Sequence, residues 1–221
     1  MIPLRDSEAE HRLTPVNSLL IVANVAVFAI EIRLGPHAVR VFERFAMVPA
    51  SIAREQSAAL ITLITALFLH AGFAHIAGNM LYLFIFGPAI EERMGRRRYL
   101  VFYLLAGIIA GLAMVAMGPE SRIPVVGASG AIAGVLGAYL ALFPGGRITA
   151  VVPFLFFIRV LEIPAIFFLI VWFALQLYSG IASGSGPLIG GIAWWAHVGG
   201  FLFGLALGPL LARRKPPRRR R

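Results

Sequence analysis

Six apolar segments, separated by polar or glycine-rich stretches, run along the chain of 221 residues. They cover roughly residues 17–34, 75–90, 99–117, 129–143, 164–178 and 192–211. A helix needs about 20 apolar residues to cross a hydrocarbon core of about 30 Å, and most of these segments approach that length. A transmembrane barrel would instead show alternating segments of about 10 residues with much weaker hydropathy. The pattern predicts an all-α, polytopic membrane protein with six transmembrane helices.

Four stretches depart from this simple pattern. Segment 129–143 is short for a full crossing, which fits a helix that begins at the floor of a cavity. Residues 35–57 mix apolar and charged side chains, so they form either an amphipathic segment in the membrane interface or an ordinary ordered loop. Residues 148–161 are apolar but contain Pro153 and Arg159, which indicates an interfacial hairpin. Residues 179–191 are rich in Gly and Ser and are predicted to be mobile.

Composition supports the membrane assignment and excludes several chemistries. The chain is 59% hydrophobic and 14% charged, with a mean hydropathy of +0.85. It contains no Cys, which excludes disulfides, thiolate metal sites and a cysteine nucleophile. We expect no cofactor.

Basic residues fall mainly on one side of the predicted topology. With both termini on the same side, that side holds 15 of the 20 Lys and Arg residues, including the seven of the tail 213–221. The positive-inside rule then places both termini in the cytoplasm. We expect a cytoplasmic arm (1–16), a membrane domain (17–211) and a basic tail (212–221) that contacts anionic lipids. No soluble domain remains to bind nucleic acid.

Polar residues cluster where the second span begins, in the sequence HAGFAHIAGNM. His75 and Asn79 are four residues apart and share a helix face, and His70 precedes them at a similar depth. Such neutral donors, gathered in a water-poor cavity, could stabilise an oxyanion. A buried polar cluster that fastens helices together explains them equally well. Two His and an Asn without a carboxylate form a poor metal site, so no metal is expected.

Glycine strips on the fourth and sixth spans predict that these two helices pack together. Gly130 and Gly134 lie on one face of the fourth span, and Gly200 and Gly204 follow His197 on one face of the sixth. Close packing would place the start of the fourth span beside His197.

That start carries Ser129, whose hydroxyl needs a base within hydrogen-bond reach to become a nucleophile. Asp6 is the only Asp, and Glu31 and Glu162 lie near span ends, so no orienting carboxylate is evident. The sequence therefore suggests a Ser-His dyad rather than a triad.

In combination and in this order, the sequences HAGFAHIAGNM, GASGAIAGVLG and AHVGGFLFG resemble those of the rhomboid intramembrane serine proteases. The resemblance covers about residues 58–211 and extends to Glu91 and Gly95. It implies a six-helix rhomboid-like bundle that cleaves transmembrane protein substrates, and we expect it in a prokaryotic inner or plasma membrane.

The resemblance also implies roles for individual residues. Ser129 would be the nucleophile and His197 the general base and acid. His75 and Asn79, with the Ser129 backbone N–H, would form the oxyanion hole. Further residues would support the site: His70, Gly127, Gly130, Gly200 and Gly204. Glu91 would be structural, residues 35–57 would form a membrane-embedded hairpin, and the fifth span with the loop after it would form a lateral gate and cap.

One departure concerns the environment of His197. Family members often carry an aromatic residue one turn after the nucleophile, but this chain has Ala133 there. We expect His197 either to be held by another group, such as an aromatic residue from a different span, or to be held less firmly. Two other functions stay open: a non-catalytic protein that binds membrane helices, and a small proton-coupled transporter using His70, His75 and His197 as a relay.

Overall fold

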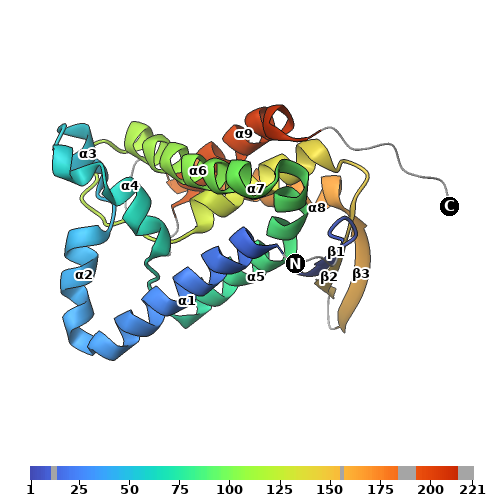
Figure 1. The fold of residues 1–221 in the computed structure, drawn as a ribbon, viewed down its shortest axis with the longest axis horizontal. Helices are drawn as coiled ribbons and strands as arrows, with labels where there is room; N and C mark the ends of the chain where they lie inside the picture. The colour runs from blue at the N-terminus through green and yellow to red at the C-terminus, as the bar shows by residue number, and fades with distance from the viewer. Residues whose placement is uncertain (11–13, 155–156, 184–192, 214–221) are drawn as a thin grey trace.

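The computed structural model describes residues 1–10, 14–154, 157–183 and 193–213, and it is mostly helical (Figure 1). Within these residues, five helices are long and apolar enough to cross a membrane. They are α1 (Pro15–Leu34), α5 (Phe73–Met94), α6 (Arg96–Met117), α8 (Ala165–Ser183) and α9 (Trp194–Leu211). The predicted short span is α7 (Ser129–Leu142). The predicted helical membrane bundle is therefore confirmed.

Helix α7 forms the centre of the bundle. Every residue from Gly130 to Tyr139 is buried, as expected for a helix that is apolar on all sides. It packs against α5, α6, α8 and α9. Its 14 residues span only about 21 Å, less than the hydrocarbon core of a bilayer. A cavity lined by Ser129, Ile132 and Leu136 lies towards the N-terminal end of this helix.

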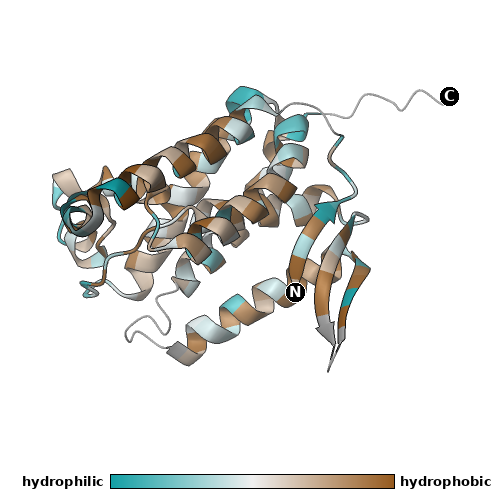
Figure 2. Cartoon of the chain, turned by 90° about the horizontal axis from the view of Figure 1, so that it is seen from below, coloured by the Kyte–Doolittle hydropathy of each residue, from teal (hydrophilic) through white to brown (hydrophobic). Residues whose placement is uncertain are grey.

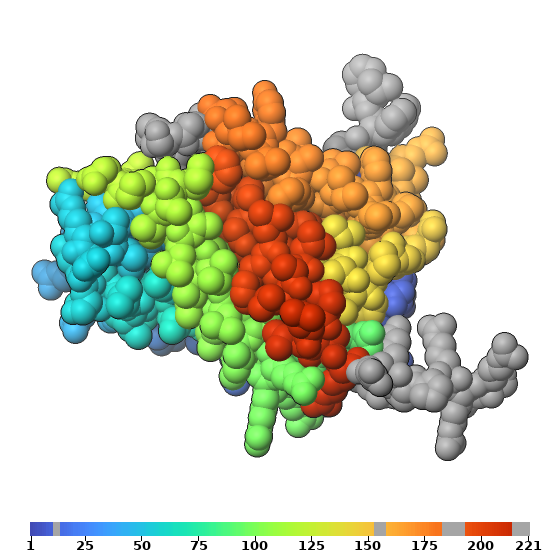
Figure 3. All heavy atoms as spheres, turned by 90° about the horizontal axis from the view of Figure 1, so that it is seen from above, coloured from blue at the N-terminus to red at the C-terminus, as the bar shows by residue number. Residues whose placement is uncertain are grey.

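Helices α7 and α9 meet backbone to backbone along the two glycine strips. A methyl group on Gly200 would overlap the carbonyl oxygen of Gly130, and one on Gly204 would overlap that of Gly134. Only glycine allows helices to approach this closely. In Figure 3, α9 runs across the surface between α6 and α8. The predicted packing of the fourth span on the sixth is confirmed.

The outer faces of the long helices are apolar. Figure 2 shows hydrophobic residues extending along the helices. Leu19 and Val22 on α1, Phe167 on α8 and Leu202 on α9 all expose about half of their surface or more. Exposed apolar surface of this extent suits contact with lipid chains rather than with water.

Polar residues join α1 to its neighbours inside this apolar bundle. The Glu91 carboxylate on α5 accepts hydrogen bonds from the backbone N–H groups of Val16 and Asn17, at 3.2 and 2.7 Å. These groups lie in the first turn of α1, where N–H donors have no partner within the helix. The Asn17 side chain also accepts from the Tyr99 hydroxyl at 2.7 Å. Glu91 therefore fixes the entry of the chain into the bundle, in line with the structural role that the resemblance implies.

Residues 35–57 form three short helices. They are η1 (Gly35–His37), α2 (Ala38–Phe45) and α3 (Pro49–Ala53). No residue of α2 is buried, and it mixes charged residues with exposed Val39 and Phe45. Met47 anchors the segment through hydrogen bonds with Val125 of 3.1 and 2.7 Å. The amphipathic helix is present, and its location in the membrane interface stays a prediction. The chain then continues through η2 (Ser57–Ala59), α4 (Thr62–Thr65) and η3 (Ala66–Phe68).

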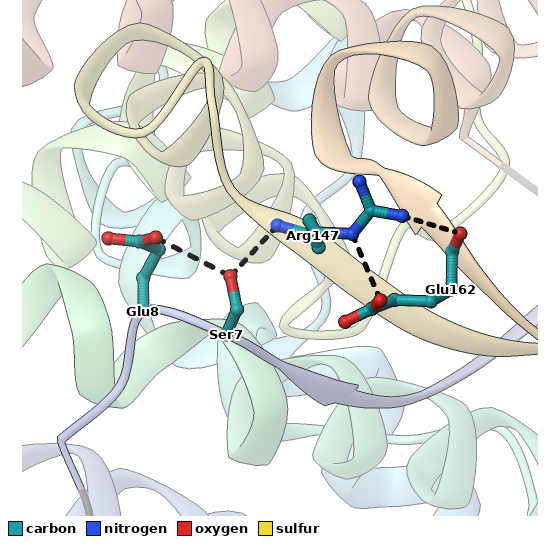
Figure 4. A network of polar contacts seen from close by, with 4 residues as sticks. All are labelled: Ser7, Glu8, Arg147 and Glu162. Atoms are coloured by element: carbon teal, nitrogen blue, oxygen red, sulfur yellow. Dashed lines mark hydrogen bonds and ion pairs between the residues drawn. The ribbon is translucent and has the colours of Figure 1, made fainter.

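The predicted hairpin at 148–161 is a β-hairpin within a small sheet. Strands β2 (Arg147–Phe154) and β3 (Phe157–Pro164) pair antiparallel, and β1 (Ile2–Asp6) adds to the other edge of β2. The sequence did not predict β1. Arg147 forms a 3.0 Å ion pair with Glu162, and its backbone N–H donates to the Ser7 hydroxyl (Figure 4). On the other side of the sheet, Ile148 and Ala150 are fully buried against the bundle.

The glycine- and serine-rich segment begins later than expected. Helix α8 continues to Ser183, so residues 179–183 are helical rather than part of a loop. Residues 184–191, and with them most of the predicted mobile loop and cap, lie outside the described residues, as do 214–221 of the basic tail.

Candidate active site

One cavity brings together the main candidate residues. It has a volume of about 760 Å³ and is lined by residues of α5, α7, α8 and α9. Ser129, His197, His75 and Asn79 all line it. Residues from three apolar segments, up to 122 positions apart in the chain, therefore face one space that could hold a ligand.

Three helices begin at this cavity, so the backbone N–H groups of their first turns lie near it. Phe73 starts α5, Ser129 starts α7, and Ala193 caps α9, and each of these residues lines the cavity. The first N–H groups of a helix lack intrahelical partners and carry partial positive charge. The sequence analysis placed each helix start within two residues and expected the start of the fourth span beside His197, but it did not foresee that all three starts line one cavity.

Gly127 shapes the chain just before Ser129. Its φ of +115° lies in the region that only glycine adopts without strain, and its N–H donates to the Ala66 carbonyl at 2.8 Å. A methyl group at Gly127 would lie 2.7 Å from the His75 ring and 3.5 Å from Asn79 Nδ2. Gly127 therefore lets the segment before Ser129 pass close to both predicted oxyanion donors.

His197 is buried in the first turn of α9 and is held by α8. Its Nδ1 lies 2.8 Å from Oε1 of Gln176, and the ring of Trp172 is 5.9 Å away at 36°. Trp194 contacts the ring edge-on at 6.3 Å. Ala133 is fully buried and offers no ring. The expectation that an aromatic residue from another span contacts His197 is confirmed, with Trp172 as that residue.

Gln176 is the polar contact that the sequence analysis missed. Its amide side chain is buried inside an apolar span, four residues after Trp172. A polar residue within such a span was the only feature of the sequence that could have indicated a role for Gln176. Because an amide oxygen only accepts, this contact is a hydrogen bond when the imidazole proton is on Nδ1, and Nε2 then keeps its lone pair.

Ser129 and His197 each adjoin a residue of the close contact between α7 and α9. A methyl group at Gly130, next to Ser129, would lie 3.8 Å from both Cβ and the carbonyl oxygen of Ala196, next to His197. Among the described residues, the Ser129 hydroxyl forms no hydrogen bond with His197 in this conformation. Catalytic hydrogen bonds are often long without substrate and shorten in the complex.

Asn79 and His75, both on α5, present hydrogen-bond donors along the same cavity. Asn79 is buried, and its Nδ2 has no hydrogen-bond partner among the described residues. His75 Nδ1 is 3.4 Å from the backbone N–H of Ala71. Because this backbone N–H donates to Nδ1, the ring proton is on Nε2. A methyl group at Gly127 would lie 2.7 Å from both Nε2 and Cε1 of this ring.

His70 lies behind this wall rather than in it. It is almost fully buried, its backbone N–H donates to the Glu31 carboxylate at 3.3 Å, and its ring lies 5.2 Å from that of His75. It therefore connects α1 to the start of α5. Glu31 contacts His70 and Glu162 pairs with Arg147, so neither was found beside His197.

Comparison with known proteins supports the same segments. The family model described as the Rhomboid domain matches residues 57–214. Rhomboid protease GluP of Bacillus subtilis is 46% identical over 78 residues, or 35% of this chain and 15% of that protein. RHOMBOID-like protein 6, mitochondrial, of Arabidopsis thaliana is 32% identical over 155 residues, covering 67% of this chain and 43% of that protein.

A further alignment covers more of the chain. RHOMBOID-like protein 1 of Arabidopsis thaliana is 30% identical over 217 residues, or 86% of this chain. Even so, the chain spans only about half of that relative's length and less than half of the other two. Because the family model covers most of the chain, including both glycine strips and every candidate site residue, the protein belongs to the rhomboid family and is an integral membrane protein.

Proposed function

We propose that this protein is an intramembrane serine endopeptidase that cleaves membrane-protein substrates in or near their transmembrane helices. The observation that carries the proposal is the single cavity onto which Ser129, His197, His75 and Asn79 all open. The names of relatives such as rhomboid protease GluP support the same chemistry.

In the proposed reaction, His197 acts first as a base and then as an acid. Its Nε2 takes the proton of the Ser129 hydroxyl as Oγ attacks the scissile carbonyl. The proton then passes to the leaving amine, and the bond between carbonyl carbon and nitrogen breaks to leave an acyl-enzyme. Water, activated by the same nitrogen, releases the acyl group and regenerates Ser129.

The oxyanion would form between the start of α7 and the wall of α5. Its proposed donors are the Ser129 backbone N–H, Asn79 Nδ2 and the ring N–H of His75. The partial positive charge at three helix starts would add to their effect. Such donors are fixed before the reaction begins, so they stabilise the developing charge without reorganisation.

The substrate would be a membrane-spanning helix that unwinds locally. Backbone hydrogen bonds shield the carbonyl of an intact helix, so small or helix-breaking residues near the cleavage site should favour hydrolysis. Entry from the bilayer past α8 and the segment after it is part of the proposal.

The proposed topology places both termini in the cytoplasm of a prokaryotic cell, with the protein in its inner or plasma membrane. The excess of Lys and Arg on that side supports this orientation. Arg213 lies against Gly95, at the junction of α5 and α6, and the basic tail that begins there would contact anionic lipid headgroups.

A reconstituted cleavage assay tests the proposal. Wild-type protein in proteoliposomes should cut a single-span reporter, and Ser129→Ala should abolish the cut while still binding the reporter. Undiminished cleavage by Ser129→Ala would overturn the assignment. Binding without cleavage by the wild type would instead indicate the non-catalytic function, and proton flux that survives Ser129→Ala would indicate a transporter.

A further inference from the structure

The buried amide of Gln176 contacts the base through a single well-placed atom. Its Oε1 lies 2.8 Å from His197 Nδ1, and both side chains are at most 9% exposed. An amide inside an apolar span is costly unless its polar atoms find partners. Here the carbonyl oxygen meets the one imidazole nitrogen that the proposed reaction does not use.

The same face of α8 carries a second contact to the histidine. Trp172 and Gln176 are four residues apart, so they lie on one face of the helix. The Trp172 ring packs on the His197 ring at 5.9 Å and also lies 5.9 Å from the ring of Phe201. Trp172 limits tilting of the imidazole, while Gln176 fixes its rotation and its tautomer.

Ala133 explains why α8 must supply these contacts. It is fully buried under α9, where a methyl group on Gly200 would lie 3.4 Å from its Cβ. The side of His197 that faces α7 therefore has no aromatic ring at this position. The groups that contact the imidazole come from α8 instead.

We infer that Gln176 is a positioning residue for His197, which holds the Nδ1–H tautomer so that Nε2 faces Ser129 as an unprotonated base. This rests on the proposed protease function and adds a third group to the dyad. Unlike a carboxylate, the neutral amide orients the imidazole without placing a negative charge in the membrane interior. A charged residue there would carry a much larger desolvation cost.

The first test measures catalysis in the reconstituted protein. Gln176→Leu removes the acceptor at similar volume and should lower kcat by about 100-fold with little change in KM, because the base is misplaced rather than the substrate. Gln176→Glu keeps an oxygen acceptor and should recover part of the lost rate, with the rest withheld by the desolvation cost of its charge. Gln56→Leu makes the same chemical change in the loop after α3 and should leave kcat unchanged.

The second test reads the histidine directly and does not depend on activity. Nitrogen NMR of ¹⁵N-histidine-labelled protein should show the His197 ring protonated at Nδ1 in wild type, identified by its loss in His197→Ala. In Gln176→Leu this signal should shift to the other tautomer or to a mixture. An unchanged tautomer together with an unchanged kcat would overturn the inference.

The two proposals fail in distinguishable ways. If wild-type protein cuts no reporter but the tautomer responds to Gln176→Leu, the positioning role stands and the protease proposal does not. If Ser129→Ala abolishes cleavage while Gln176→Leu changes neither tautomer nor kcat, the protease stands and the positioning role does not.

Discussion

Helix α9 meets its two neighbours, α7 and α8, through different kinds of contact. Towards α7 it presents glycine, and backbone lies directly on backbone at Gly200 and Gly204. Towards α8 it presents side chains, and His197 is held by the Trp172 ring and the Gln176 amide. We call the contact of Gly200 and Gly204 with the backbone of Gly130 and Gly134 the glycine seam. It contains no side chains that can rotate, whereas the contact with α8 depends on the side-chain rotamers of Trp172 and Gln176. The first contact sets how close Ser129 and His197 are, and the second sets how the imidazole is turned.

A Ser-His dyad requires that its two residues are close together and that the imidazole is correctly oriented, and the two contacts of α9 meet these requirements separately. Proximity must survive thermal motion, which close packing of buried α7 on α9 provides. Orientation requires a specific hydrogen bond, which only a polar side chain supplies. Substitutions in the seam should therefore act on folding, and substitutions around the imidazole should act on catalysis.

The largest effect on stability is expected from a methyl group in the α7–α9 glycine contact. Gly204→Ala would force Cβ into the Gly134 carbonyl oxygen and should lower the free energy of unfolding by about 3 kcal/mol, as overpacking of a rigid contact does. Denaturant titration in detergent micelles measures this. Gly78→Ala on α5 is the matched control, because nothing lies within 4 Å of its Cβ position and Ala favours the helix by up to about 1 kcal/mol. Equal stability of the two variants would contradict the seam.

Asn79→Ala should separate catalysis from folding. It removes a buried donor that has no partner among the described residues, so stability should change little. If Asn79 stabilises the oxyanion, kcat should fall by about 100- to 1000-fold. Reporter cleavage measures the change in kcat, and a thermal melt of the same preparation measures the change in stability. A large loss of stability with an unchanged kcat would show that Asn79 only fastens helices together.

The smallest effect is expected in the sheet, far from both contacts. The Arg147–Glu162 ion pair is 3.0 Å long, but both side chains are about half exposed. Exposed pairs contribute less than about 1 kcal/mol, so Glu162→Gln should barely change stability or cleavage. The same denaturant titration checks this. A loss as large as that of Gly204→Ala would mean that the sheet supports the seam.

Most of the bundle could be predicted because apolar length and glycine spacing are local signals. Helices α1, α5, α6 and α7 begin within about three residues of their predicted starts, and the glycine strips identified which helices touch. Strand β1 was missed because its pairing partner lies more than 140 residues away in the sequence. Gln176 was missed for a similar reason, since one amide in an apolar span does not reveal which residue it contacts.

Covalent labelling tests most directly whether Ser129 is a nucleophile activated by His197. A fluorophosphonate probe, applied to the protein in liposomes and followed by mass spectrometry of the digested chain, reports which residue reacts. We predict one adduct, on Ser129, which disappears in Ser129→Ala and is strongly reduced in His197→Ala. Labelling of His197→Ala as strong as that of the wild type, or an adduct on any other residue, would contradict the dyad.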